Sequence, residues 1–250
     1  MTRKIDNVPR EVFDTSKSKR RKYQALAVGQ LGLWALIKYE LIITLASPLP
    51  GALGLLLRSR LYPLLLGKCG RNVFFGSNVT LRHPHKIRIG SNVVIDDGCV
   101  LDAKGSSNTG ITIGNDVFIG RQTSINTKDG DIVLEDGVNI GAFCMVFSAS
   151  HVRCGTNTLI AAYTYLVGGD HDMTSTDSAI VSQDRPSTGI TVGSSGWIGT
   201  GVSILDGVCI GHDVVIGANS VVTHDLEDFA VAVGSPAVVK RVRQPLPTTS

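Results

Sequence analysis

Large apolar residues recur at every sixth position along most of this chain, in groups of three. Seven such triplets lie between residues 69 and 222, and 18 of their 21 positions are Ile, Leu or Val. The next residue is Gly at 11 of the positions, and small or β-branched residues dominate four places after each one. The triplets are Cys69, Phe75, Leu81; Ile89, Ile95, Leu101; Ile113, Ile119, Ile125; Leu134, Ile140, Val146; Cys154, Ile160, Leu166; Val192, Ile198, Ile204; and Ile210, Ile216, Val222.

A period of six matches neither a helix nor the alternation of an ordinary strand. It predicts an all-β solenoid whose coils have three short flat sides, each with one large side chain pointing inward. Glycine after that side chain is expected to supply a positive φ at the corner. Seven coils stacked as parallel strands about 4.8 Å apart form a prism roughly 34 Å long. A β-sandwich would instead show alternation with turns every 8–12 residues.

The repeat is interrupted for longest between Leu166 and Val192, which predicts an extruded loop over residues 168–190. Long loops on rigid scaffolds usually carry function. His171 lies near the base of this loop. An imidazole, whose ordinary pKa is about 6.5, can take a proton from a hydroxyl or amine at neutral pH. The alternative interpretation is an ordinary surface histidine.

Residues 23–66 differ from the repeat in being apolar, rich in Leu and interrupted by Pro48 and Pro50. They predict two helices, at about 23–46 and 51–66. The uncharged run before Lys38 is 15 residues long, shorter than the roughly 20 residues that span a bilayer. The segment is expected either to cap the open end of the solenoid or to bind a membrane surface, and both roles are compatible.

The distribution of charge and the cysteine content limit which partners and which cellular compartment fit this chain. The net charge is +3, but residues 1–22 hold eight Lys/Arg against three acidic residues, so the remainder carries −2. This argues against nucleic-acid binding by the solenoid.

The five cysteines are odd in number and contain no CxxC motif, which favours a reducing compartment. The first 22 residues lack the apolar stretch of a signal peptide. We therefore expect a cytoplasmic protein, with peripheral contact at the inner membrane face left open for residues 1–66.

Residues 69–241 resemble the hexapeptide-repeat acyltransferases, whose fold is a left-handed parallel β-helix. The left hand is implied by this resemblance alone, since the general rule for parallel crossovers predicts the opposite. The expected organisation is a basic, flexible N-terminus (1–22), an α-helical segment (23–68), the β-helix acyltransferase domain (69–241) and a flexible tail (242–250).

The resemblance also implies a catalytic residue. In sugar and xenobiotic acetyltransferases of this family, the catalytic His follows an Ile-Ala corner by the spacing that joins Ile160 and Ala161 to His171. His171 is thus expected to act as general base. Galactoside and maltose members carry an Asn where this chain has Tyr163, which puts the acceptor in doubt. Serine acetyltransferases carry their His where this chain has Ala103, which argues against that activity.

Several other polar residues are weaker candidates. Asp102 is expected to orient the imidazole from a neighbouring coil or chain, although a solvated corner carboxylate is the alternative. Asp170 and Asp172 are less favoured because they are immediate neighbours of His171. Zinc carbonic anhydrases share this fold, but the histidines here lack their arrangement, so no metal is expected. The histidines weighed for this purpose are His83, His85, His151 and His171.

The segments GWIGTGVSIL, IGANSVVTHDL and AVAVGSPAVVKRVR resemble the C-terminal coils that hold coenzyme A in the family. Glycines there would leave a groove for the pantetheine arm, and basic side chains would meet its phosphates. Turn geometry alone is the alternative explanation for the glycines. The candidate donor-binding residues are Trp197, Gly199, Thr200, Gly217, Ala218, Thr223, Lys240 and Arg241.

The sequence thus predicts an acetyl-CoA-dependent O-acetyltransferase whose acceptor is a sugar or glycan of bacterial polysaccharide biosynthesis. The resemblance implies a homotrimer with the site between two prisms, where His171 of one chain faces the donor groove of the next. Alternatives are a xenobiotic acetyltransferase, an amino-sugar N-acetyltransferase and, in another class, a non-catalytic β-helix scaffold.

Overall fold

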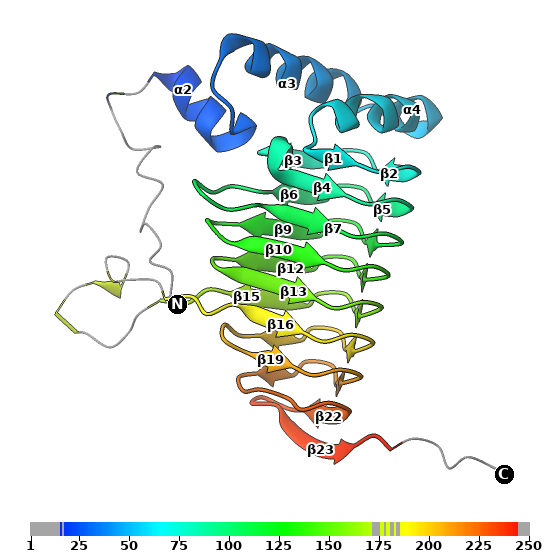
Figure 1. The fold of residues 1–250 in the computed structure, drawn as a ribbon, viewed down its shortest axis with the longest axis vertical. Coiled ribbons are helices and arrows are strands. Elements are labelled where there is room, and N and C mark those ends of the chain that lie inside the picture. The colour runs from blue at the N-terminus through cyan, green and yellow to red at the C-terminus, as the bar shows by residue number, and fades with distance from the viewer. Residues whose placement is uncertain are drawn as a thin grey trace.

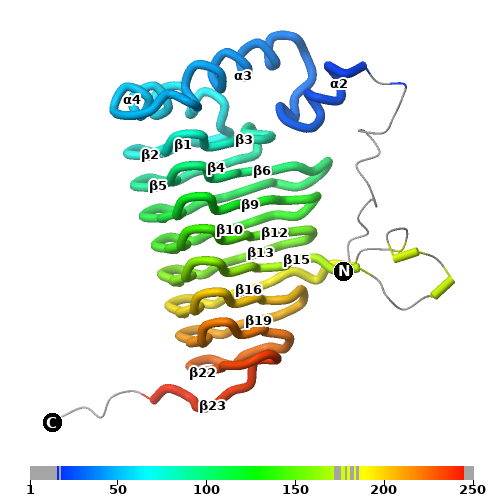
Figure 2. The backbone as a smooth tube through the Cα atoms, turned by 180° about the vertical axis from the view of Figure 1, so that it is seen from behind, coloured from blue at the N-terminus to red at the C-terminus, as the bar shows by residue number. Residues whose placement is uncertain are grey.

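The computed structural model describes residues 16, 18–171, 176, 177, 179, 180, 183 and 186–244. Seven coils stack into a prism, and each coil contributes one strand to each of three parallel sheets (Figures 1 and 2). Sheet A consists of β1 (Lys68–Cys69), β4 (Ile87–Ile89), β7 (Ile111–Ile113), β10 (Asp131–Leu134), β13 (His151–Cys154), β16 (Ile190–Val192) and β19 (Cys209–Ile210).

The other two sheets complete the triangle. Sheet B consists of β2 (Val73–Phe75), β5 (Val93–Ile95), β8 (Phe118–Ile119), β11 (Asn139–Ile140), β14 (Leu159–Ile160), β17 (Trp197–Ile198), β20 (Val215–Ile216), β22 (Ala230–Val233) and β23 (Val238–Val242). Sheet C consists of β3 (Thr80–Arg82), β6 (Val100–Asp102), β9 (Ser124–Thr127), β12 (Met145–Ser148), β15 (Tyr165–Gly168), β18 (Ser203–Ile204) and β21 (Val221–Val222). The predicted solenoid of about seven coils is confirmed.

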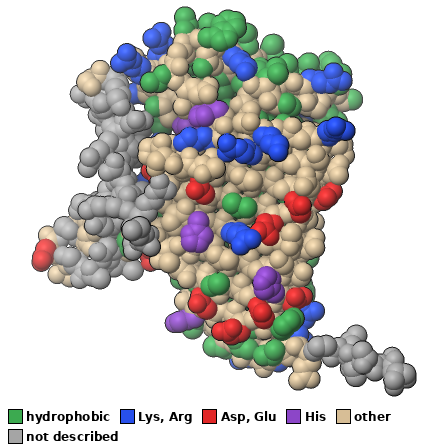
Figure 3. All heavy atoms as spheres, in the orientation of Figure 1, with side chains coloured by type: hydrophobic (Ala, Val, Ile, Leu, Met, Phe, Trp, Pro, Cys, Tyr) green, Lys and Arg blue, Asp and Glu red, His purple; other side chains and the backbone are tan. Residues whose placement is uncertain are grey.

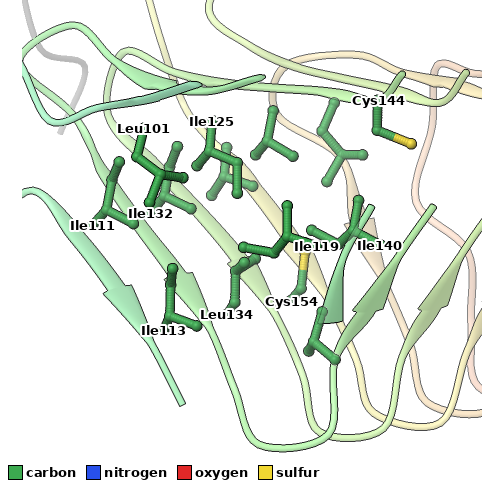
Figure 4. Packing of buried hydrophobic residues seen from close by; sticks show 14 of the residues in the cluster. Leu101, Ile111, Ile113, Ile119, Ile125, Ile132, Leu134, Ile140, Cys144 and Cys154 are labelled. Atoms are coloured by element: carbon green, nitrogen blue, oxygen red, sulfur yellow. The ribbon is translucent and has the colours of Figure 1, made fainter. Parts of the chain in front are cut away.

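The repeat positions form the core of the prism. Every predicted inward residue except the partly exposed Cys69 is buried, and the aliphatic side chains pack against one another inside the three sheets (Figure 4). Successive coils are in register, so that Ile140 pairs with both Ile119 and Ile160. Each coil therefore buries its large side chains mainly against those of its neighbours, as expected of a solenoid.

The corners differ from the sequence-based expectation. The glycine after the inward residue does not supply the positive φ. That conformation occurs two residues later, for example at Gln122 (φ 58°) and Asn219 (φ 57°). Glycine is needed earlier because the next coil passes very close: a Cβ at Gly120 would lie 2.7 Å from the backbone N of Ala142. The spacing between coils, and not backbone conformation, accounts for this glycine.

Helices close one end of the prism and form the helical cap, residues 19–64 (Figure 1). The expected first helix is broken at Gly29 (φ 72°) and Gly32 (φ 121°), and a side chain at Gly29 would overlap the ring of His83. Buried tyrosines tie the helical cap to the first coil, since the Tyr39 hydroxyl donates to Leu81 O at 2.8 Å. The elements are α2 (Lys19–Tyr23), a π-helical turn (Gln24–Val28), α3 (Leu33–Ala46), α4 (Gly51–Leu61) and 3-10 turns at Tyr62–Leu64 and Pro84–Lys86.

Candidate active site

The predicted loop leaves the prism between β15 and β16, at the edge where sheet C meets sheet A. Its two limbs are joined at the base. The backbone N of Asp170 donates to Pro186 O at 3.2 Å, and the Ser187 hydroxyl donates to Gly168 O at 3.3 Å. The start and the end of the loop are therefore held against each other where they leave the prism.

Asp206 anchors the returning limb of this loop. Its carboxylate accepts from the backbone N of Thr188 at 2.7 Å, from the backbone N of Gly189 at 2.9 Å and from the Ser187 hydroxyl at 3.2 Å. Sequence reasoning missed Asp206, because acidic residues occupy many corners of the repeat and nothing in the pattern distinguishes this one.

His171 lies at the mouth of a cavity of about 230 Å³ beside sheet C. Its backbone N donates to the Asp170 carboxylate at 2.7 Å. The ring Nδ1 is buried and makes no hydrogen bond to any other part of the chain that the structure describes. The cavity is lined by Lys128, Phe147, Ala149, Tyr165, Val167, Gly169, Asp170 and His171. The imidazole thus borders a space of mixed polarity in which a small polar group fits.

Asp102 lies apart from His171 within one chain. It is in register with Val167 across β6, β9, β12 and β15, and three strand spacings amount to roughly 14 Å. Its carboxylate instead approaches Nδ1 of His83 at 3.5 Å and accepts from the backbone N of Lys104 at 3.1 Å. Asp172, the other weak candidate, falls outside the described residues.

Most of the candidate donor-binding residues lie on sheet B and at its edge with sheet C. Trp197 is 54% exposed on β17, and Thr200 and Ala218 are exposed at that edge on successive coils. Added Cβ atoms at Gly199 and Gly217 would lie 2.7 Å from Ala218 N and 2.5 Å from Val233 Cγ1. The backbone of the next coil therefore leaves no room for a side chain at Gly199, whereas the close contact at Gly217 is with a side chain.

The remaining three donor candidates are more scattered. Lys240 and Arg241 are exposed on β23, the last strand of sheet B, which pairs antiparallel with β22. Thr223 follows β21 at the opposite edge of sheet C, where its hydroxyl lies 2.8 Å from Nδ1 of His224. The structure brings Trp197, Thr200 and Ala218 together, but it does not place Thr223 with them.

Sheet C separates His171 from the candidate donor edge in a single chain. The loop emerges at the edge of sheets C and A, whereas Thr200 and Ala218 lie at the edge of sheets B and C. A four-residue strand such as β15 spans roughly 13 Å. A pantetheine arm lying along the donor edge would therefore be remote from the imidazole of its own chain.

Tyr163 stacks on Phe143 of the preceding coil. The ring centroids are 5.2 Å apart with an interplanar angle of 4°. Both residues have positive φ, and Tyr163 is 63% exposed. A pair of stacked, exposed aromatic rings thus lies at the edge of sheets B and C, where the resemblance implied the side-chain amide of an Asn.

A larger cavity of about 460 Å³ lies on sheet A and contains none of the predicted site residues. Its lining includes the charged or titratable residues Glu135, Arg153, His212, Asp225, Glu227 and Asp228. Across the described residues, no group of three or more His, Cys, Asp or Glu side chains is arranged to hold a metal ion.

Comparison with known proteins identifies the family of the chain. No family model matches the chain. It is 32% identical over 134 residues to WcaF of Escherichia coli, named as a colanic acid biosynthesis acetyltransferase, and the match covers 54% of this chain and 70% of WcaF. The chain belongs to the hexapeptide-repeat acyltransferases. The resemblance predicted from the sequence is confirmed.

Two further acyltransferase relatives match over shorter shares of their length. Rv3034c of Mycobacterium tuberculosis, named as an acetyltransferase, is 31% identical over 54% of this chain and 45% of its own. WbbJ of Escherichia coli, named as a lipopolysaccharide biosynthesis O-acetyl transferase, is 30% identical over 44% of this chain and 60% of its own. The chain spans less than two thirds of the length of both proteins.

Solved structures share the fold of the chain. The polySia-specific acetyltransferase NeuO is 22% identical with a TM-score of 0.54, covering 72% of this chain and 85% of NeuO. AntD, an N-acyltransferase from Bacillus cereus in complex with dTDP and 3-hydroxybutyryl-CoA, is 23% identical with a TM-score of 0.51, covering 75% of this chain and 88% of AntD. At these identities the likeness concerns the fold alone.

Proposed function

We propose that this hexapeptide-repeat acyltransferase is an acetyl-CoA-dependent O-acetyltransferase whose acceptor is a sugar or glycan. The observation that carries the proposal is the position of His171. It borders a cavity at the base of the loop, where hydrogen bonds join the two limbs of the loop. Its imidazole takes the proton of an acceptor hydroxyl as the oxygen attacks the thioester carbonyl. Collapse of the tetrahedral intermediate expels the coenzyme A thiolate, which takes the proton back from the imidazolium.

The names of the relatives support both substrates. WbbJ and WcaF are named for lipopolysaccharide and colanic acid biosynthesis, which favours a glycan acceptor. AntD was solved with an acyl-CoA bound on the same fold, which favours an acyl-CoA donor. Xenobiotic acetylation and amino-sugar N-acetylation use the same proton transfer, so an acceptor panel separates them. The cytoplasmic location stays a prediction.

We further propose that the site forms between chains of a homotrimer. Two features support this assembly: sheet C separates His171 from the donor edge, and that edge carries the exposed aromatic residues Phe143 and Tyr163, with Trp197 exposed nearby on sheet B. In such an assembly the loop of one chain reaches the donor edge of the next. Asp102 keeps a role as orienting group only if another chain supplies it, because its own His171 is too far away.

The direct test measures thiol release from acetyl-CoA with a panel of sugars, amino sugars and antibiotics. We expect acceptor-dependent release, and His171→Ala should lower kcat by about 100-fold or more, because general-base catalysis contributes 10²–10⁴. His212→Ala, an exposed histidine on sheet A, serves as the matched control and should keep its activity. Absence of release with every acceptor, together with no binding of acetyl-CoA in calorimetry, would favour the scaffold.

A further inference from the structure

The side of the helical cap that faces away from the prism is apolar and exposed. Trp34 is 78% exposed, and the other members are each more than half exposed. Figure 3 shows exposed hydrophobic side chains gathered at the helical end of the molecule. We call the set the apolar cap surface; it consists of Leu31, Leu33, Trp34, Leu41, Leu45, Leu53, Leu56 and Leu64.

Helix α3 is apolar on two separate sides. Tyr39, Ile42 and Ala46 are buried toward the prism. Trp34, Leu41 and Leu45 recur at helical spacing on the exposed side. A helix that served only to close the solenoid needs one apolar side and presents polar residues to water. The second apolar side of α3 is therefore unexplained by the closing role.

Basic residues surround this end of the molecule. Residues 18–95 contain twelve Lys/Arg and one acidic residue, Glu40, whereas residues 96–244 contain eight Lys/Arg and seventeen Asp/Glu. Figure 3 shows the same division, with Lys and Arg near the helical end and most acidic side chains lower on the prism. The exposed members, which we call the basic collar, are Lys19, Arg20, Arg21, Lys38, Arg60, Lys68, Arg71, Arg82 and Arg88.

Length limits what the helices can do in a bilayer. Among the described residues no single helix is long and apolar enough to cross a membrane, and the only pair that meets the length and composition requirement, Lys19–Val28 with Leu33–Ala46, is bent by 61°. A helix with Trp and Leu on its free side beside a cluster of basic residues fits the interface of a bilayer, where it lies in the plane of the headgroups.

We propose that the apolar cap surface and the basic collar bind the surface of an anionic lipid membrane. The positive charge of the basic collar distinguishes between two possible partners of this surface, an anionic membrane and a second copy of the chain. Two copies meeting through this surface would bring two basic collars together, which is unfavourable, whereas anionic headgroups complement the collar. In the proposed trimer with parallel prisms, three such surfaces would face the same way, and binding of the first would raise the effective concentration of the other two at the membrane. This inference goes beyond acetyl transfer and does not depend on it.

The test is sedimentation of the full chain with vesicles at about 0.1 M salt. We expect partition onto phosphatidylcholine vesicles that contain phosphatidylglycerol, and at least tenfold weaker partition onto phosphatidylcholine alone. The triple variant Trp34→Gln, Leu41→Gln, Leu45→Gln should lose about 100-fold in partition, because it removes apolar area that would enter the interface. The triple variant Lys19→Gln, Arg20→Gln, Arg21→Gln should lose a similar factor on the anionic vesicles.

A matched control changes exposed apolar residues at the opposite end, Phe229→Gln with Val242→Gln, and should bind like the unmodified chain. Circular dichroism checks that all variants are folded, since each altered side chain is exposed. The proposal is overturned if the unmodified chain stays in the supernatant, or if the control loses binding equally. It is also overturned if the apolar variant lowers the oligomeric state without lipid, because the surface is then a protein interface.

Discussion

Arg58 places a guanidinium inside the junction between the helical cap and the first coil. The residue is 3% exposed. Nε donates to Phe75 O at 2.9 Å, and Nη1 donates to Ala46 O at 3.0 Å and to Leu49 O at 2.6 Å. One side chain thus joins the end of α3, the turn before α4 and strand β2.

Replacing Arg58 tests how much this junction contributes to stability. We expect Arg58→Ala to lower the free energy of unfolding by about 3 kcal/mol, because buried carbonyl groups lose their donor and packing is lost. Arg60→Ala, on the exposed side of the same helix, should change it by less than about 0.5 kcal/mol. Urea denaturation measures both variants, and equal effects would show that Arg58 is not the residue that ties the helical cap down.

The inward residues could be predicted from the sequence because the six-residue period specifies which side chain each flat side buries. The corner conformation could not be predicted, because a glycine after the inward residue has two possible causes. Either the backbone there has a positive φ, or the neighbouring coil passes too close to leave room for a side chain. The structure shows the second, and it moves the positive φ to residues such as Phe143 and Tyr163. Stacking of those two rings depends on coil register, which the period alone does not reveal.

At the scale of elements, the returning limb of the extruded loop is held by Asp206 on the following coil. We expect Asp206→Ala to lower kcat by up to about 100-fold while KM for acetyl-CoA stays unchanged, because the loop that carries His171 loses three hydrogen bonds at its base and small displacements of a catalytic group are costly. Steady-state kinetics with both substrates measures this split.

Two further variants complete the test of Asp206. Asp206→Asn keeps one carbonyl acceptor and should restore part of kcat. Asp213→Ala removes a corner carboxylate whose contact to Arg243 is 3.9 Å, and it should leave kcat near that of the unmodified chain. A rise in KM with unchanged kcat in Asp206→Ala would mean that Asp206 acts on donor binding instead of on His171.

The helical cap shows what sequence reasoning left open at this scale. Apolar residues surround α3 on both sides, so their periodicity was compatible with closing the solenoid and with binding a membrane. The structure establishes the first role through Tyr39, Ile42 and Ala46. The break at Gly29 escaped prediction because it depends on contact with His83, a residue more than fifty positions away.

At the scale of the whole molecule, the position of the site between chains is open to a complementation test. We would mix His171→Ala chains with Ala218→Trp chains, whose bulky side chain blocks the donor edge. Random mixing in a cyclic trimer gives competent pairs at about one quarter of the interfaces, so about a quarter of the unmodified activity should return. Each variant alone should be inactive. No recovery in confirmed mixed oligomers would place His171 and the donor edge within one chain.

The distance between the helical cap and the loop has a consequence for acceptor length. Counted from the helices, β15 is the fifth strand of sheet C, so four spacings put it about 19 Å along the prism from the first strand. Helix α3 lies across the end of the prism (Figure 1). On a bilayer contacted through the apolar cap surface, the prism therefore stands upright and holds His171 well above the headgroups. A lipid-linked acceptor would have to be several sugars long to reach it. Lipid-linked acceptors of graded length should become substrates only beyond that reach, so the number of coils between the membrane and the loop would set the smallest membrane-bound glycan that is acetylated.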